Sequence, residues 1–175
     1  MLIPSLQQLN DIRKEGFRPG IVACIIFEKK IVLFFKKDYN LWQLPQGRIN
    51  NKQTVIDSIK TTLKEELGAD FIGHLTISDY KIIDVDRMEF KPGKHELEKL
   101  FDDDGREINM VGKVYYFCII ESDSPQMDIK KTKYDEFHWM DYHKANFIAQ
   151  RIYQKGKKRI TGNIINKLHD LGIIV

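Results

Sequence analysis

The stretch that decides the fold is LWQLPQGRINNKQTVIDSIKTTLKEELGA, residues 41–69. Residues 38–52 are rich in Asn, Gln, Gly and Pro and lack helical periodicity, which indicates a loop. A helix is expected to follow, with Thr54 as its N-cap and Gly68 at its end. Its apolar residues recur at helical spacing, at positions 55, 56, 59, 63 and 67. The stretch therefore predicts a polar loop followed by an amphipathic helix.

Two adjacent carboxylates, Glu65 and Glu66, lie near the end of the predicted helix. They share one face with position 62, because these positions are three and four residues apart. Such carboxylates repel each other and oppose the helix dipole unless a cation neutralises them. Mg²⁺ is one such cation, since it takes oxygen ligands and accompanies phosphate substrates. For paired glutamates taken alone, a solvated surface is the more common arrangement.

The context of these glutamates resembles the Nudix box, G-x5-E-x7-R-E-U-x-E-E-x-G-U, where U is an aliphatic residue. The matching positions are both glycines, the last two glutamates, the first aliphatic position and a small final residue: Gly47, Gly68, Glu65, Glu66, Leu63 and Ala69. The loop and the helix keep these residues in register. The segment is therefore identified as resembling the Nudix family.

The resemblance extends over most of the chain. GFRPGIVACIIF (residues 16–27) and LWQLPQGRIN (residues 41–50) are similar to one branch of the Nudix family. That branch holds bacterial RNA pyrophosphohydrolases and plant-type diadenosine tetraphosphate hydrolases. Residues 112–120 and 136–139 continue the likeness, which covers residues 16–153.

The resemblance implies both a fold and a chemistry. The fold would be a Nudix-type α/β/α sandwich of the α+β class with a mixed central sheet. The activity would be that of a pyrophosphohydrolase acting on a nucleoside polyphosphate, a dinucleoside polyphosphate or an RNA 5′ triphosphate end, with Mg²⁺ or Mn²⁺. The implied catalytic carboxylates are Glu65, Glu66 and Glu136, and the implied metal ligands are these three residues with Gly47.

Three residues depart from the Nudix signature. Gln53 stands in place of its first glutamate, Thr61 in place of its arginine, and Thr62 in place of the glutamate that follows. The first two are interpreted as a coupled change, in which a neutral hydrogen bond replaces an ion pair. Thr62 replaces a charged metal ligand with a neutral hydroxyl, so metal affinity and rate are expected to fall.

Basic residues are the first candidates for binding a substrate. Arg18 resembles a family arginine suited to a 5′ phosphate or a base edge; the alternative is a surface arginine at a strand entrance. Lys36 and Lys37 end a predicted strand near the loop, and Lys113 is a further candidate. Residues 155–159 hold four cations, which could contact phosphate, although such a run is more often a solvated face.

Trp42 and Gln43 are candidates for lining a substrate pocket. An aromatic residue at this position is more often part of the core than of a pocket. No histidine has a partner at metal-binding or nucleophile spacing, and no P-loop or GxGxxG motif appears in a supporting context. The chemistry implied by the sequence is therefore metal-assisted.

The rest of the chain predicts strands followed by helices. Residues 1–15 form a helical or irregular lead, and residues 87–109 an insertion or loop with a helical turn near residues 96–101. Residues 143–175 are predicted to be helical, with interruptions near Gly156 and Gly162. Strands are predicted within residues 21–27, 31–35, 71–85, 111–121 and 137–140. Elements segregated in this way favour an α+β sandwich over a doubly wound parallel sheet.

The bulk properties fit one soluble domain over residues 1–175. A composition of 42% hydrophobic and 30% charged residues excludes both a disordered tail and a membrane protein. A net charge of +3 implies no general affinity for nucleic acid. Cys24 and Cys118 lie in apolar runs without metal-binding spacing and are predicted to be reduced core thiols. Without a signal peptide or a membrane-length apolar run, a cytoplasmic location is expected.

Three functions remain open at this stage. The first is the metal-dependent pyrophosphohydrolase, motivated by the loop and the retained glutamates. The second is a module that binds a nucleotide or an RNA 5′ end without hydrolysing it, motivated by Thr62. The third is an interaction protein that uses the fold only as a scaffold. Turnover of a phosphoanhydride substrate separates the first function from the other two.

Overall fold

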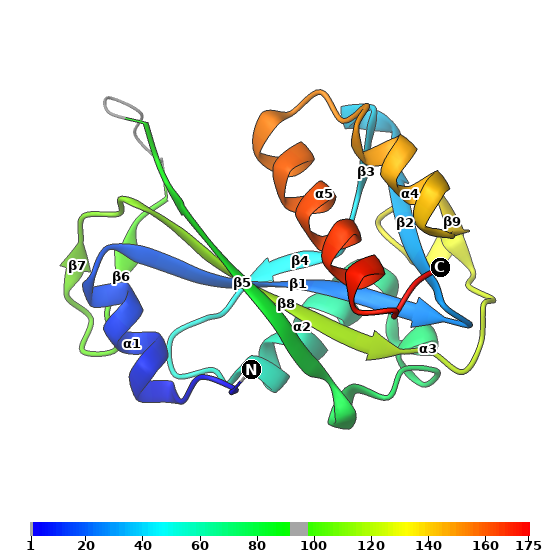
Figure 1. Ribbon diagram of the computed structural model, residues 1–175. Coiled ribbons are helices and arrows are strands. Elements are labelled where there is room, and N and C mark those ends of the chain that lie inside the picture. The colour runs from blue at the N-terminus through cyan, green and yellow to red at the C-terminus, as the bar shows by residue number, and fades with distance from the viewer. Residues whose placement is uncertain (1, 92–97) are drawn as a thin grey trace.

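The computed structural model describes residues 2–91 and 98–175, and a mixed sheet runs through its centre (Figure 1). The main path of the sheet is β3-β2-β1-β8-β5, with β4 paired to β1 and β9 paired to β2. β1 and β8 run parallel, whereas the other pairs are antiparallel. The strands are β1 (Phe17–Phe27), β2 (Lys30–Lys36), β3 (Leu41–Gln43), β4 (Gln46–Arg48), β5 (Lys81–Glu89), β8 (Gly112–Glu121) and β9 (Glu136–Met140). The mixed sheet is therefore confirmed.

β1 and β2 form the predicted hairpin but separate soon after their turn. Glu28 and Lys29 both have left-handed backbone angles, with φ of 46° and 60°, which suits a two-residue hairpin turn. Only residues 26–27 of β1 pair with residues 30–31 of β2. Beyond this point residues 41–48 bridge the separated strands, since β3 pairs with β2 and β4 pairs with β1. This divergence places the polar loop between two parts of the sheet.

Helices cover both faces of the sheet and give it an α/β/α arrangement (Figure 1). In β1, residues 21, 23 and 25 pack in one core cluster with α2 and α3, while residues 22, 24 and 26 pack in another with α4 and α5. This alternation is the period of two expected when a strand is buried on both faces. The helices are α1 (Leu6–Lys14), α2 (Val55–Leu67), α3 (Ala69–Ile72), α4 (Tyr142–Ala149) and α5 (Lys155–Asp170).

Helix α2 begins and ends where the sequence predicts. The Thr54 hydroxyl accepts a hydrogen bond from the backbone N–H of Asp57, which satisfies a donor of the first turn. Gly68 ends the helix with a φ of +84°, and a Cβ at this position would lie 2.8 Å from the carbonyl oxygen of Lys131. Glycine is therefore required there for its backbone angle and for space.

Two predicted segments differ from the structure before β5. Residues 38–52, predicted as a loop, contain the short strands β3 and β4 and part of a 3-10 turn, η1 (Lys37–Tyr39). Residues 71–85, predicted as strand, begin with the end of α3 and a second 3-10 turn, η2 (Ile77–Asp79). Phe71 and Ile77 are buried in the core from these turns. Short apolar runs do not distinguish a strand from a packed turn, which explains the error.

Two later predictions also need correction. Residues 87–89, placed in a loop, belong to β5 and pair with β8. β6 (Leu100–Phe101) and β7 (Glu107–Ile108) form a two-stranded ribbon where a helical turn was expected near residues 96–101, of which 96 and 97 lie outside the described residues. Gly156 and Gly162 lie inside α5, and the break falls between α4 and α5. Packing of the apolar face of α5 on the sheet outweighs the low helix propensity of glycine.

A third 3-10 turn, η3 (Ile129–Lys131), precedes β9.

The two cysteines are free and fully buried, as predicted for core thiols. Burial raises the pKa of both thiols, that of Cys118 to about 12. Neither thiol is therefore suited to act as a nucleophile at neutral pH. Within residues 2–91 and 98–175, none of the helices combines the length and the apolar character needed to cross a membrane.

Candidate functional site

A cavity of about 390 Å³ lies beside the segment that bridges β1 and β2. Its lining comes from β2, η1, β3, β4, α2, α5 and the chain just before β9, so it is built from distant parts of the sequence. The side chains that line it are Lys36, Tyr39, Gln43, Gln46, Glu66, Lys133, Tyr134 and Lys157. Three of these are lysines and one is an acid, which gives the cavity an excess of positive charge.

Glu66 is the acid of this cavity, and it is held from several sides. Its carboxylate accepts hydrogen bonds from the Tyr134 hydroxyl and the backbone N–H of Gln46. Burial raises the pKa of Glu66, while the Tyr134 hydrogen bond and the nearby charges of Lys133 and Lys157 oppose that rise. Glu66 is thus a fixed, partly desolvated carboxylate with lysines around it.

Lys157 reaches the cavity from the first turn of α5. Its ammonium group donates a hydrogen bond of 2.7 Å to the side-chain oxygen of Gln43. Burial lowers the pKa of Lys157, the charge of Glu66 opposes this, and the charge of Lys113 adds to it. The Tyr153 hydroxyl, just before α5, donates to the carbonyl oxygen of Tyr39 at 2.6 Å. These contacts fix the start of α5 against the rim of the cavity.

The residues that depart from the Nudix signature run from just before α2 to the middle of the helix, where Thr62 lies one turn before Glu66. Gln53 donates to the Thr61 hydroxyl at 3.1 Å and accepts from the backbone N–H of Asn50 at 3.0 Å. The predicted neutral hydrogen bond between Gln53 and Thr61 is therefore confirmed. Thr62 is buried, with 6% exposure, and a Cβ on Gly47 would lie only 2.3 Å from its hydroxyl oxygen. Thr62 thus fills the space directly against Gly47.

The three carboxylates expected to bind a metal do not converge. Glu65 is exposed and is not among the residues that line the cavity. Glu136 pairs with Phe35, so it projects from the face of the sheet on which Phe35 contacts Trp42. Helix α2, which carries Glu66, packs on the opposite face. No group of three His, Cys, Asp or Glu able to hold a metal occurs among the described residues. The residues present therefore do not fit a three-carboxylate metal site.

Some of the candidate substrate residues line the Glu66 cavity, whereas others lie elsewhere. Lys36 and Gln43 line the cavity with Glu66. Trp42 packs between the rings of Phe35 and His138, with centroid distances of 5.2 and 5.6 Å. This is the core-like arrangement that the sequence left as the alternative.

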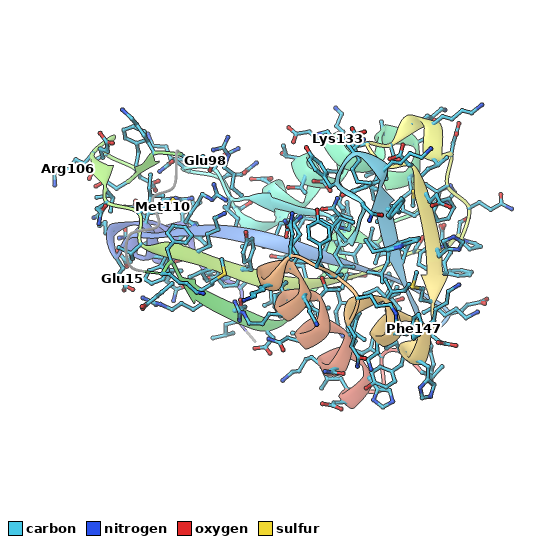
Figure 2. All side chains as sticks on the ribbon, turned by 90° about the horizontal axis from the view of Figure 1, so that it is seen from above. Glu15, Glu98, Arg106, Met110, Lys133 and Phe147 are labelled. Carbon is cyan, nitrogen blue, oxygen red and sulfur yellow. The ribbon has the colours of Figure 1, made fainter. Side chains whose placement is uncertain are left out.

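The other basic candidates lie outside this cavity. Lys37 is exposed, and its backbone N–H donates to Asp135 at 2.6 Å. Arg18 forms an ion pair with Glu98, which lies close to the β6–β7 ribbon (Figure 2). Arg18 also lines a smaller cavity of about 150 Å³ that shares Gln46 with the Glu66 cavity. Lys113 lines a neighbouring groove of about 700 Å³ that also includes Gln46 and Lys157. The groove therefore continues from the Glu66 cavity along β8 and the start of α5.

Several residues of the site were not singled out by the sequence. Lys133 and Tyr134 precede Glu136, which the resemblance marked as a site residue. Gln46 lies beside the marked Gly47. Lys157 belongs to the basic run at residues 155–159, which indicated phosphate contact without identifying the lysine. A helical projection from Ile160 and Ile164, which are buried, would have separated the members of that run.

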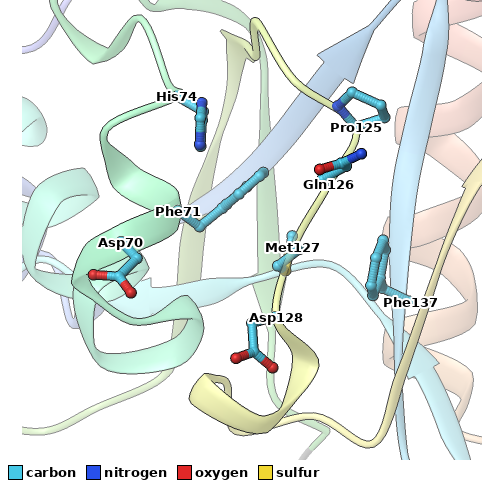
Figure 3. A pocket seen from close by; sticks show the side chains of 8 residues that line it. All are labelled: Asp70, Phe71, His74, Pro125, Gln126, Met127, Asp128 and Phe137. Carbon is cyan, nitrogen blue, oxygen red and sulfur yellow. The ribbon is translucent and has the colours of Figure 1, made fainter.

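A second cavity, of about 550 Å³, lies beside α3 and has a different character (Figure 3). Its wall includes Phe71, Met127 and Phe137. Of its two acids, Asp70 is paired with Lys131 and Asp128 accepts from the backbone N–H of Lys130, while His74 is bound to Asp123 at 2.8 Å. This cavity is mainly apolar, and its acids and its histidine are engaged with other groups. The Glu66 cavity is therefore the better candidate for chemistry.

Comparisons with known proteins add relatives for this fold. No protein-family model matches the chain. The RNA pyrophosphohydrolase of Histophilus somni (strain 2336) is 30% identical over 155 residues, which cover 82% of this chain and 76% of the relative. The RNA pyrophosphohydrolase of Actinobacillus pleuropneumoniae serotype 5b (strain L20) is 26% identical over 164 residues, covering 87% and 75%. A crystal structure of a MutT NUDIX hydrolase from Burkholderia pseudomallei shares the fold, with a TM-score of 0.53, 16% identity, and coverage of 83% of this chain and 95% of that one.

Proposed function

Because the chain belongs to the Nudix hydrolase superfamily, we propose that it is a pyrophosphohydrolase whose reaction takes place in the Glu66 cavity. The proposed substrate is a nucleoside polyphosphate, a dinucleoside polyphosphate or an RNA 5′ triphosphate end. The 30% identical relative is named an RNA pyrophosphohydrolase, which supports a phosphoanhydride as the bond that is cleaved.

The observation that carries the proposal is that three lysines line the same cavity as one half-buried carboxylate. Lys36, Lys133 and Lys157 line the cavity that contains Glu66. Ammonium groups bind phosphate as compact positive charges, and their effect is stronger where burial limits screening by water. A polyphosphate chain is the ligand whose charge best matches this lining.

The same residues suggest roles in the reaction. The lysines would neutralise the phosphate oxygens, on which charge increases as the bond breaks. A water oxygen would form a bond to phosphorus as the anhydride P–O bond breaks, and Glu66 would accept the proton that the water loses. The raised pKa of Glu66 makes it a better proton acceptor than a solvated glutamate. Two phosphate products would leave the cavity.

Divalent cations enter the proposal only as additions to the assay. Nudix hydrolases generally use divalent metals, and Mg²⁺ or Mn²⁺ is the expectation from the sequence. The dispersed positions of Glu65, Glu66 and Glu136 do not provide the three-carboxylate site expected from the sequence. Hydrolysis should therefore be measured with Mg²⁺, with Mn²⁺ and with EDTA.

The test is phosphate release from a panel of nucleoside triphosphates, dinucleoside polyphosphates and 5′-triphosphate RNA. Glu66→Gln should lower the turnover of the best substrate by at least about 100-fold, because it removes the proposed proton acceptor. Glu107→Gln, an exposed change in β7, is the matched control and should leave turnover unchanged. Parent turnover no higher than that of Glu66→Gln on every substrate would reject the proposal.

Glu65→Gln tests whether the cavity is the correct site. Because Glu65 is exposed and outside the cavity, its loss should reduce turnover less than the loss of Glu66. An equal loss would favour the arrangement expected from the sequence, in which both glutamates share one metal site.

A second function is favoured by Thr62 and by the dispersed carboxylates. In this alternative the cavity binds a nucleotide or an RNA 5′ end without cleaving it. Ligand-induced stabilisation of the parent protein without turnover of any panel member would support it. Thr62→Glu is a weak test, since it would place a carboxylate in a buried position against Gly47.

A further inference from the structure

The cavity holds one acid, where the sequence led us to expect a three-carboxylate site, and it holds cations of its own. Glu66 is the only acid among its eight lining residues, and three of the others are lysines. The charges of Lys133 and Lys157 both act on Glu66 and lower its pKa, opposing the effect of burial. The positive charge beside this carboxylate is thus supplied by side chains of the chain itself.

We propose that Lys157 takes the place of a metal ion beside Glu66, so that the cavity binds the terminal phosphates of a polyphosphate through lysine ammonium groups without a divalent cation. This inference deepens the proposed function and rests on its assignment of the cavity to a phosphoanhydride ligand. It concerns binding, which can be measured whether or not hydrolysis follows.

The position of Lys157 is fixed before any ligand arrives. Its hydrogen bond to Gln43 and the contact between Tyr153 and Tyr39 hold the first turn of α5 at the cavity rim. Buried residues further along α5, including Ile160 and Ile164, anchor the helix on the sheet. A preorganised ammonium group loses little conformational freedom on binding, which favours affinity.

Charge also argues against a metal ion at this place. A divalent cation next to Glu66 would lie near the ammonium groups of Lys133 and Lys157 and would be repelled by both. An anion meets the opposite situation, because the three lysines attract it and the two glutamines provide neutral hydrogen-bond partners. The cavity is therefore better matched to phosphate than to Mg²⁺.

The neighbouring groove offers room for the rest of the ligand. It shares Gln46 and Lys157 with the cavity, and Lys113 and Lys155 add further positive charge, whereas Arg159 is paired with Asp86. The same phosphate chemistry could therefore come from a free nucleotide or from the 5′ end of an RNA. Inorganic triphosphate, ATP and a 5′-triphosphate oligonucleotide distinguish these sources.

Calorimetric titration of the full chain with inorganic triphosphate is the test, in EDTA and again in Mg²⁺. We expect binding in EDTA, and Lys157→Gln should weaken it by about tenfold or more, since a hydrogen bond to a charged group is lost. Lys144→Gln, an exposed change on α4 that also removes one positive charge, should leave the affinity unchanged. Lys157→Arg keeps the charge and should retain most of the binding.

The outcomes separate this inference from the proposed function. Binding that requires Mg²⁺, or that Lys157→Gln does not weaken in a variant with parental melting temperature, overturns the inference. Hydrolysis in Mg²⁺ without any binding in EDTA would support the proposed function but reject the inference that Lys157 takes the place of a metal ion. Binding in EDTA without hydrolysis under any condition would support binding through lysine and reject the proposed hydrolysis. If the Lys157→Gln variant does not fold, the Lys157→Arg variant and the EDTA titration of the parent still decide.

Discussion

Helix α2 treats the charged positions of the Nudix signature in two ways, replacing some and retaining others. From Gln53, before the helix, to Thr62, at its middle, neutral residues replace charged ones, and a neutral hydrogen bond and close packing against Gly47 hold this region together. We call this the packed end. At the end that carries Glu66, the carboxylate is retained and faces a cavity lined by lysines. We call this the open end.

The difference teaches that replaced and retained motif residues have distinct consequences. At the packed end the substitutions fit one another and maintain the loop geometry. At the open end the retained acid shares its cavity with three lysines, so the cavity has an excess of positive charge. Changes at the packed end should therefore affect stability, and changes at the open end should affect ligand binding.

The largest effect on stability is expected from Arg13→Ala, which removes the support of the packed end. Arg13 is 2% exposed, and its guanidinium donates to the carbonyl oxygens of Ile49 and Asn50 at 2.8 and 3.0 Å. It also pairs with Asp103 at 3.3 Å. Removing it leaves the buried carbonyl oxygen of Ile49 without this donor and breaks the buried ion pair, at a cost of about 3 kcal/mol, whereas the Asn50 carbonyl oxygen still accepts from the backbone N–H of Gln53. Urea unfolding measures this, with Lys14→Ala, an exposed neighbouring cation, as the control. A loss as small as that of the control would show that the loop is held by other contacts.

Gly47→Ala should destabilise the protein by about 2 kcal/mol, because its Cβ would overlap the Thr62 hydroxyl. Adding Thr62→Ala removes the 2.3 Å contact and leaves the nearest Thr62 atom, its Cβ, at 3.2 Å, so the double variant should recover part of the loss. Gly162→Ala is the matched glycine control, since it has no atom within 4 Å and lies inside α5. It should stabilise the helix slightly. Additive effects of Gly47→Ala and Thr62→Ala would contradict the packed end as described.

Gln53→Ala should cost about 1 kcal/mol through loss of two neutral hydrogen bonds. Thr61→Val removes one of the same bonds from its other side. A double-mutant cycle on the free energies of unfolding of Gln53→Ala, Thr61→Val and the double variant should therefore give a coupling of about 0.5 kcal/mol. No measurable coupling would mean that the bond between Gln53 and Thr61 does not contribute to the fold.

The smallest effect on stability is expected at the open end, from Lys36→Gln. Lys36 is half-buried at the cavity and lies 4.0 Å from the exposed Asp38, so its loss should change the unfolding free energy by less than about 0.5 kcal/mol. The affinity of the Lys36→Gln variant for inorganic triphosphate should nevertheless fall to about one third of that of the parent or less. A large loss of stability with unchanged affinity would reverse the comparison between the two ends.

Much of the fold could be predicted from the sequence, because its signals are local. The hairpin, the start of α2 at Thr54 and its end at Gly68 follow from strand propensity, capping and backbone geometry. The errors at residues 71–85 and at Gly156 and Gly162 arose where packing outweighs local preference.

The candidate site could be predicted only in part. Glu66, Lys36 and Gln43 were selected from the sequence and lie together in the cavity. The position of Glu136 depends on the register of β9 against β2, and a shift of one residue would move it to the other face. The pairing of β9 with β2 joins segments about 100 residues apart, so no local sequence pattern predicts its register.

The sequence by itself determined the long central strands and helix α2 of this protein, the family it resembles and the carboxylate near the end of α2. It could do so because capping, periodicity and turn chemistry act between residues that are close along the chain. Only the tertiary structure decided that Lys133 and Lys157, rather than Glu65 and Glu136, accompany Glu66. The physical reason is that β1 and β2 diverge and α5 packs over the gap. Which charges meet in a cavity is therefore set by strand register and helix packing between distant segments.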